Sequence, residues 1–276
     1  MRDPVSFSWR PEFRAPVVVV GWSIDAGDLG NRVTRYLIQK LGGASFCSLD
    51  PAEFFSMGGI IIEEDVVQFP QSEFFGFPEY DLVVLQSAPP TQEWYRFLNV
   101  TLDVAQNHCH ARELYTVGGM ISPRAHTTPR ELAGVFNSLD LRDSLAAYPM
   151  NRDMDYETPP GQLPTLSSFL LWTARRRNLP GASLWVPIPF YLLAWDDAAA
   201  QKRVLEFLDQ RLALHLDFGE LDNRIREEND RLAQARQQSP ELDGYITRLE
   251  SNQPLTQEES EKLVKGIQEY LSRKTR

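Results

Sequence analysis

Four consecutive valines, Val17 to Val20, stand between Pro16 and Gly21. A continuous run of β-branched side chains is typical of a strand buried on both faces, as in a parallel sheet that has helices on either side. A glycine-containing loop follows, and leucine or valine then recurs every fourth residue from Leu29 to Leu41, just before Gly42. This spacing predicts a helix that ends at the glycine, so the chain begins with a strand, a loop and a helix.

The same alternation recurs along the first 216 residues. Apolar runs predict further strands, and helical spacing predicts further helices. The predicted strands are residues 44–49, 81–86, 112–117 and 182–186, and the predicted helices are residues 91–106, residues 164–177 and a segment after Asp196. Alternating strands and helices favour parallel pairing with right-handed crossovers. We therefore predict an α/β fold of three layers with a mostly parallel sheet.

Charge density separates residues 217–276 from the rest of the chain. In this segment 23 of 60 residues are charged, against 43 of the preceding 216. Leu221 and Ile225 belong to a heptad-like apolar stripe, which predicts a helix that packs against the main domain or against another subunit. We expect an α/β core domain over residues 1–216 and a helical C-terminal extension over residues 217–276.

The composition argues against several classes of function. A formal net charge of −10 disfavours broad contact with nucleic-acid phosphates. No run approaches the roughly 18 apolar residues of a membrane-spanning helix. Two cysteines, Cys47 and Cys109, are too few for a disulfide framework, and the first residues lack the apolar run of a secretory signal. We expect a cytoplasmic protein that binds neither nucleic acid nor a membrane.

Glycines and polar residues gather where the predicted strands end. Ligands of open parallel sheets usually sit beyond the carboxyl ends of the strands. At that rim the sequence places Gly21, Asp25, Gly27, Gly118, Gly119 and Tyr191. The glycine spacing matches neither the dinucleotide fingerprint nor the phosphate-binding P-loop, so we expect no cofactor. Asp25 is also placed to cap the following helix.

Histidines offer two further candidate sites. His126 follows the glycine pair and titrates near neutral pH, but acyl transfer also needs a nucleophile and an orienting carboxylate. The sequence has no Gly-x-Ser-x-Gly elbow, so a structural histidine held by hydrogen bonds is favoured and no catalytic residue is assigned. His108 and His110 have no third ligand nearby, and we predict no metal site there.

Aromatic residues are concentrated between residues 54 and 77. Residues 60–69 and 73–77 flank Pro70, which predicts a hairpin or flap that carries Phe69, Phe74, Phe75 and Phe77. Exposed aromatic clusters mark interfaces, whereas a local mini-core beneath the flap would bury the same rings. Both alternatives stay open.

Several segments together resemble the proteasome-assembly-chaperone family, in particular its bacterial members of unassigned activity. The resemblance is carried by Gly21-Trp22, Asp25-Ala26-Gly27, Gly118-Gly119, His126-Thr127, Ser183-Leu184-Trp185 and Tyr191. It implies a phosphorylase- or hydrolase-like α/β fold with a helical C-terminal appendage. It also implies chains that commonly form homo-oligomers or pair with a related chain. It also adds Trp22 and Thr127 to the candidate residues at the rim.

We therefore expect a non-enzymatic, homo-oligomeric interaction or assembly-chaperone-like protein, with a trimer among the assemblies considered. The aromatic flap and the helical tail would bind an unidentified protein partner. The alternative is a hydrolase or binding protein for a nucleoside-like or acyl molecule, in which Asp25, His126 and Tyr191 meet at the rim. That alternative requires these three side chains to share one site.

Overall fold

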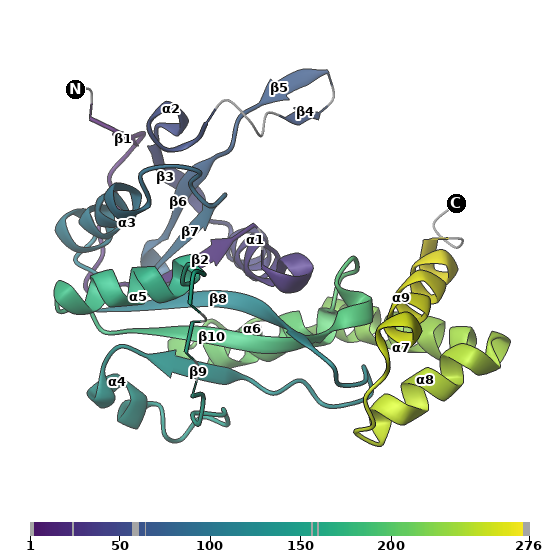
Figure 1. The fold of residues 1–276 in the computed structure, drawn as a ribbon. Coiled ribbons are helices and arrows are strands. Elements are labelled where there is room, and N and C mark those ends of the chain that lie inside the picture. The colour runs from purple at the N-terminus through teal and green to yellow at the C-terminus, as the bar shows by residue number, and fades with distance from the viewer. Residues whose placement is uncertain are drawn as a thin grey trace.

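The described residues form one mixed sheet of eight strands and a separate two-stranded hairpin (Figure 1). The structure is a computed structural model and describes residues 3–23, 25–56, 61–63, 65–155, 157–158 and 160–272. The strands of the main sheet lie in the order β1-β3-β6-β7-β2-β8-β10-β9, and β4 pairs with β5. Their bounds are β1 Val5–Phe7, β2 Val17–Trp22, β3 Ala44–Leu49, β4 Ile61–Glu63, β5 Val66–Gln68, β6 Ser72–Phe77, β7 Leu82–Ser87, β8 Glu113–Ser122, β9 Ala133–Phe136 and β10 Gly181–Pro189.

The centre of the main sheet is parallel and its flanks are antiparallel. β2 pairs in parallel with β7 on one side and with β8 on the other, and β10 lies parallel to β8. β1, β3 and β6 form antiparallel pairs at one flank, and β9 does so at the other. Residues 78–81 are too few for a crossover, so β6 runs antiparallel to β7. The predicted α/β fold class is confirmed, with the parallel pairs confined to the centre.

Helices cover both faces of the sheet and produce the predicted three layers (Figure 1). Val17 and Val19 face a core that includes α1 and α6, whereas Val18 and Val20 face α3 and α5. All four valines are fully buried, as expected for a central strand. The helices of this body are α1 Leu29–Leu41, α2 Pro51–Phe54, α3 Trp94–Asp103, α4 Leu139–Ser144, α5 Leu166–Arg176 and α6 Ala198–Leu212, with a π-helix at Val104–His108 and 3-10 turns at Ala26–Asp28 (η1), Pro78–Tyr80 (η2) and Phe190–Leu192 (η4).

Three further helices, α7 Gly219–Gln238, α8 Pro240–Glu250 and α9 Gln257–Ser272, pack together at one end of the body (Figure 1). A capping box of Thr256 and Glu259 forms at the start of α9: the Thr256 N–H donates to Glu259 Oε2 at 2.7 Å, and Thr256 Oγ1 accepts from the Glu259 N–H at 3.3 Å. Leu232, Ile246 and Ile267 share a small core with Tyr191 of η4.

The first half of α7 belongs to the body rather than to the tail cluster. Leu221 is fully buried in the core that contains α1 and α6, and half-buried Ile225 packs against the same core. Of the two packings predicted for this apolar stripe, the structure shows contact with the main domain. The division into domains at residue 216 stays a prediction. No helix of the described chain has the length and apolar character that a membrane span requires.

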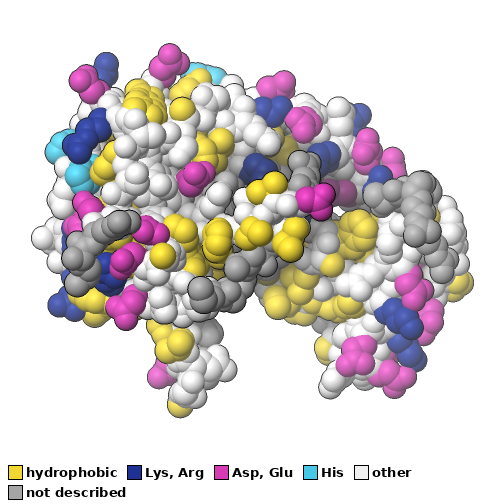
Figure 2. Space-filling view, turned by 90° about the horizontal axis from the view of Figure 1, so that it is seen from above, with side chains coloured by type: hydrophobic (Ala, Val, Ile, Leu, Met, Phe, Trp, Pro, Cys, Tyr) yellow, Lys and Arg dark blue, Asp and Glu magenta, His cyan; other side chains and the backbone are white. Residues whose placement is uncertain are grey.

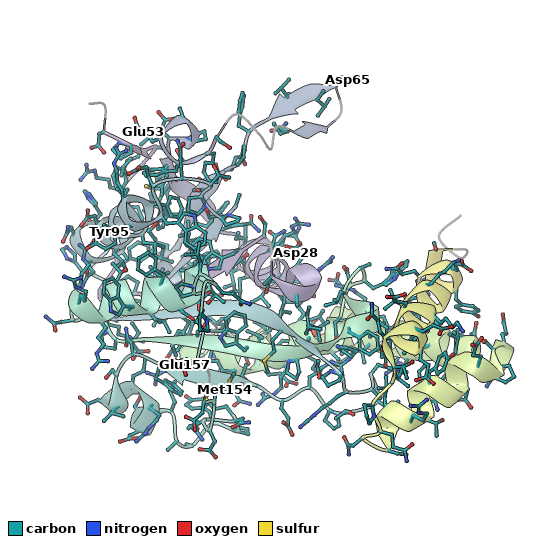
Figure 3. All side chains as sticks on the ribbon, in the orientation of Figure 1. Asp28, Glu53, Asp65, Tyr95, Met154 and Glu157 are labelled. Atoms are coloured by element: carbon teal, nitrogen blue, oxygen red, sulfur yellow. The ribbon has the colours of Figure 1, made fainter. Side chains whose placement is uncertain are left out.

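The segment predicted as an aromatic flap divides into two structures. The β4–β5 hairpin projects from the body (Figure 1), and Asp65 marks its turn in Figure 3. Ile60 and Glu64, which the prediction included, lie outside the described residues. β6 is instead an interior strand of the main sheet, between β3 and β7.

The prediction that Phe74 and Phe77 lie on a flap is therefore wrong. Their side chains are 0% and 3% exposed because β6 has a paired neighbour on each edge and covered faces. Phe75 is half-buried against the core of α1 and α6. Phe69, which follows β5, is 56% exposed, so it alone of the four phenylalanines lies largely in solvent.

Candidate functional site

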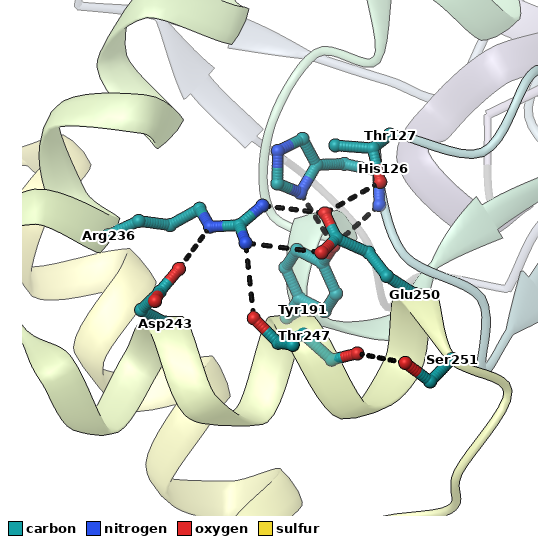
Figure 4. A network of polar contacts seen from close by, with 8 residues as sticks. All are labelled: His126, Thr127, Tyr191, Arg236, Asp243, Thr247, Glu250 and Ser251. Atoms are coloured by element: carbon teal, nitrogen blue, oxygen red, sulfur yellow. Dashed lines mark hydrogen bonds and ion pairs between the residues drawn. The ribbon is translucent and has the colours of Figure 1, made fainter.

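His126 and Tyr191 meet where the loop after β8 passes η4. The Tyr191 hydroxyl accepts a hydrogen bond from the backbone N–H of His126 at 2.6 Å and lies 2.8 Å from Nδ1 of the same residue (Figure 4). Burial, together with the nearby charges of Arg236 and Arg130, lowers the pKa of His126 to about 4. Burial also raises the pKa of Tyr191. Both groups are therefore neutral near pH 7. An imidazole with a pKa of about 4 is a weak proton acceptor, which suits a structural pair better than a general base.

Ionic and hydrogen bonds join this pair to the C-terminal helices (Figure 4). Thr127 Oγ1 donates to Glu250 Oε1 of α8 at 2.9 Å. Arg236 of α7 binds both oxygens of Glu250, at 2.6 and 3.1 Å, and its Nε donates to Asp243 at 2.6 Å. The cluster of His126, Thr127 and Tyr191 thus connects the body to the helical tail.

Asp25 occupies a different place, between the end of β2 and the start of α1. Its Oδ2 accepts hydrogen bonds from the backbone N–H groups of Gly119 at 2.6 Å and Gly30 at 3.0 Å. Its Oδ1 is buried and has no hydrogen-bond partner among the described residues. Burial raises the pKa of Asp25 from 3.8 to about 7, since the two backbone hydrogen bonds only partly offset the loss of water and Asp28 adds repulsion.

The glycines at the rim allow this close packing. Gly118 and Gly119 do not turn the chain after a strand; they lie within β8 and pair with Trp185 and Val186. A Cβ atom on Gly119 would come within 2.0 Å of the Ala26 carbonyl oxygen, and one on Gly21 within 2.3 Å of the Gly30 oxygen. Gly27 has a φ of 69°, a conformation that side chains disfavour.

The structure therefore separates the residues of the predicted rim into two groups. Asp25 lies with Gly118 and Gly119, and His126 lies with Thr127 and Tyr191. No hydrogen bond among the described residues joins Asp25 to His126 or Tyr191. The single site on which the small-molecule hydrolase alternative depended does not form, so the geometry gives that reaction no support.

His108 and His110 are exposed, and buried Cys109 lies between them. The ring of His108 lies 4.7 Å from that of Phe7, and burial raises the pKa of the Cys109 thiol to about 12. In the part of the chain that the structure describes, no three His, Cys, Asp or Glu side chains are grouped to hold a metal ion.

The sequence did not reveal a cavity of about 310 Å³ beside Asp25. Trp22 and Gly118, which were candidates, line it together with Trp94, Ser167 and Trp185. The Trp22 Nε1–H donates to Ser167 Oγ at 3.0 Å, which fixes the indole of Trp22 against α5. These residues come from five distant segments, so no local pattern connects them.

The sequence also did not reveal an exposed aromatic ladder, which we define as Tyr95, Phe169, Trp172 and Arg176. The rings of Tyr95 and Phe169 are 6.2 Å apart, and Phe169 stacks on Trp172 at 5.5 Å. The Arg176 guanidinium lies 4.9 Å from the Trp172 ring. Tyr95 and Trp172 are 51% and 47% exposed. The spacing of Phe169, Trp172 and Arg176 on one helix face was a signal that could have identified this surface.

Solved structures with the same fold cover most of the chain. Pyrococcus furiosus PbaB, described as an archaeal proteasome activator, matches with a TM-score of 0.67 and 23% identity over 84% of this chain and 98% of PbaB. The Mycobacterium tuberculosis protein Rv2714, of unknown function, matches with a TM-score of 0.75 and 19% identity over 90% and 87% of the two chains. Pyrococcus furiosus PbaA, described as an archaeal homolog of proteasome-assembly chaperone, gives a TM-score of 0.65 and 19% identity over 91% and 99%.

At these identities the likeness concerns the fold. No curated protein matches the sequence. The resemblance stated from Gly21-Trp22, Gly118-Gly119 and the other short segments is nevertheless confirmed at the level of the family, because residues 18–236 match the PAC2 family. This chain belongs to the PAC2 family.

Proposed function

We propose that this protein is a non-enzymatic, homo-oligomeric interaction protein of the assembly-chaperone kind, and that its β4–β5 hairpin forms the contact between copies. The observation that carries the proposal is the exposed apolar surface of the hairpin. Ile62, Val66, Val67 and Phe69 are 71%, 56%, 51% and 56% exposed.

The position of the hairpin supports a contact role. It projects from the body rather than packing on it (Figure 1), and Figure 2 looks onto that side of the molecule, where hydrophobic side chains gather across the middle of the face. Burial of apolar surface releases about 25 cal/mol per Å². A stable interface buries about 800 Å² per partner, so the hairpin would act together with the neighbouring surface of the body.

The relatives support a protein rather than a metabolite as the client. PbaA is described as a homolog of proteasome-assembly chaperone and PbaB as a proteasome activator. We carry over from them only the class of partner, another polypeptide. Leu221 is fully buried within the chain and is withdrawn from the contact surface, whereas half-buried Ile225 remains a candidate.

The aromatic ladder is the surface that we assign to the unidentified protein partner. Tryptophan, tyrosine and arginine dominate the binding energy of protein interfaces, and the ladder presents all three side by side. The change Trp172→Ala should remove partner proteins captured from a host extract and leave the number of self-associated chains unchanged. Capture that does not depend on Trp172 would contradict this assignment.

Light scattering of the purified protein tests the self-association. The wild-type chain should give the mass of an oligomer, for example a trimer. The double change Val67→Ser with Phe69→Ser should weaken assembly at least tenfold. Leu163→Ser is the matched control, because Leu163 is 80% exposed but lies far along the chain from the hairpin. A wild-type protein that stays monomeric at high concentration would refute the proposal.

A cytoplasmic location completes the proposed function. Both cysteines are unpaired and buried, a state that suits a reducing compartment. Fractionation of the native cell should recover the protein with soluble cytoplasmic markers; recovery with the cell envelope would contradict this part of the proposal.

A further inference from the structure

The cavity beside Asp25 combines aromatic walls with one acidic group. Its volume of about 310 Å³ suits a small side chain or metabolite fragment, and three of its lining residues are tryptophans: Trp22, Trp94 and Trp185. Trp22 is buried, whereas Trp94 and Trp185 are half-buried and line the side nearer to solvent. Apart from Asp25, no lining residue carries a charge.

Asp25 contributes a carboxylate without a cation to balance it. No ion pair to Asp25 occurs among the described residues, and the charged side chain that acts on it most is another acid, Asp28. Arg32, the nearest base along the chain, donates instead to the Gly27 carbonyl oxygen and pairs with Asp196. A buried carboxylate with no countercharge is costly for the fold. A positively charged ligand would remove that cost.

The hydrogen bonds of Asp25 select the type of cation. Oδ2 already accepts from two backbone N–H groups, whereas buried Oδ1 accepts from none in the described chain. A guanidinium group binds best when both carboxylate oxygens are free. An ammonium group needs one free oxygen, and its N–H supplies the donor that a fully methylated ammonium lacks.

Gly118 allows the indole of Trp185 to lie close to the acid at the wall of the cavity. A Cβ atom at this position would lie 2.8 Å from Cζ3 of Trp185 and 3.3 Å from Asp25 Oδ2. The bare backbone therefore keeps the carboxylate and the aromatic wall close together. Indole rings are the aromatic groups that attract cations most strongly.

We propose that this cavity binds an alkylammonium group, with the ammonium against Asp25 and its apolar stem against Trp22, Trp94 and Trp185. Two sources carry this chemistry: a free small amine, or a lysine side chain of a bound protein. The proposal does not rest on the hairpin contact, since the cavity lies at the strand ends of the body.

Calorimetric titration of the full chain with butylammonium chloride at pH 8.5 tests the proposal. Alkylammonium groups remain charged at this pH, and Asp25 is ionised above its raised pKa of about 7. The wild-type protein should bind butylammonium at least tenfold more tightly than neutral butanol. Absence of binding, or equal binding of butanol, would overturn the proposal.

Two variants show whether Asp25 is responsible. Asp25→Asn keeps an oxygen acceptor for Gly30 and Gly119 and should weaken butylammonium binding at least tenfold, whereas Asp140→Asn, a change at an exposed acid on α4, should leave it unaltered. Binding by wild-type protein should also fall at least tenfold between pH 8.5 and pH 5.5, a measurement that does not depend on the folding of any variant. Binding that persists at pH 5.5, or in folded Asp25→Asn, would contradict the assigned role.

A second titration distinguishes the two sources of the cation. The probe is a blocked tripeptide, N-acetyl-glycyl-lysyl-glycinamide, which carries the same ammonium on a four-carbon stem. Binding of both probes identifies a lysine side chain as a ligand, and binding of butylammonium alone identifies a free amine. Failure of both probes would refute the site and leave the oligomer proposal, which light scattering tests, unaffected.

Discussion

The hydroxyl of Tyr191 lies 2.6 Å from the backbone nitrogen of His126 and 2.8 Å from its Nδ1. One buried hydroxyl thus accepts a hydrogen bond from the main chain of the β8–β9 loop and satisfies the imidazole of the same residue. Because Thr127, the next residue, binds Glu250 of α8, this contact fixes the loop on which the helical tail rests. The pair therefore has a structural role, and its loss should lower the stability of the folded protein.

Removal of the Tyr191 hydroxyl should destabilise the protein. The change Tyr191→Phe keeps the ring but leaves the buried N–H of His126 without its acceptor, which costs about 1–3 kcal/mol. Urea denaturation at pH 7 measures the loss. Tyr95→Phe is the control, because Tyr95 is 51% exposed and its change should cost under about 0.5 kcal/mol. Equal stability of the two variants would contradict the structural role assigned to the Tyr191 hydroxyl.

Stability should fall in mild acid because of His126. Its pKa is lowered from 6.5 to about 4 in the folded chain, so between these values the unfolded state binds the proton and the native state does not. The contribution is complete above pH 6.5 and is lost as the pH falls toward 4. Relative to His126→Asn, the wild-type protein should lose on the order of 2–3 kcal/mol across this window. A constant difference in urea denaturation at pH 7, 5.5 and 4 would show that His126 titrates normally.

Asp25 should give the opposite pH dependence, so that stability falls as the pH rises. Its pKa is raised from 3.8 to about 7, so the native state retains a proton that the unfolded state releases, and stability falls as the pH rises through this range. Asp25→Asn removes the titration and should gain roughly 2 kcal/mol over wild type by pH 8, with no such gain near pH 4. Thermal unfolding at both pH values measures the difference. If Asp25→Asn stabilised the protein equally at pH 4, burial of the charge would not be the cause of the stabilisation.

Two glycine-to-alanine changes should have opposite effects on stability. At Gly119 the added Cβ would lie 2.0 Å from the Ala26 carbonyl oxygen, a backbone atom that cannot move alone, so Gly119→Ala should cost about 2 kcal/mol or more. At Gly244, inside α8, nothing lies within 4 Å of the added Cβ, so Gly244→Ala should stabilise the helix by about 0.5–1 kcal/mol. Denaturation curves of both variants check the prediction, and a neutral effect at Gly119 would contradict the close packing of η1 on β8.

Local signals were sufficient to predict the elements that depend on near neighbours in the sequence. The buried strand at Val17 to Val20 and the helix that ends before Gly42 are confirmed, because nearby residues in the sequence determine both. The strand predicted over residues 182–186 is longer in the structure, since β10 continues through Pro187 and Pro189. They lie beyond Trp185, the last residue that pairs with β9, so one edge of β10 is unpaired there and tolerates a missing N–H.

The features that the sequence could not predict depend on contacts between segments that are far apart along the chain. Whether Phe74 and Phe77 lie on a flap or in a sheet depends on the pairing of β6 with β3, from which α2, β4 and β5 separate it in the sequence, and not only on its pairing with the adjacent β7. The separation of Asp25 from His126 likewise depends on how far β8 extends past its glycines. Trp94 and Trp185 approach Asp25 only in the folded chain, so the cavity left no signature in the order of residues.

Photo-crosslinking at position 69 tests the central claim most directly, namely that the exposed hairpin holds another polypeptide. Phe69 is replaced by p-benzoylphenylalanine, and the same replacement at Asp230, an exposed residue of α7, serves as the control. The account predicts that irradiation of the purified protein joins position 69 to a second copy of the chain, and that position 230 gives little or no product. Crosslinks from position 69 that stay within one chain, at concentrations where copies would meet, would contradict it.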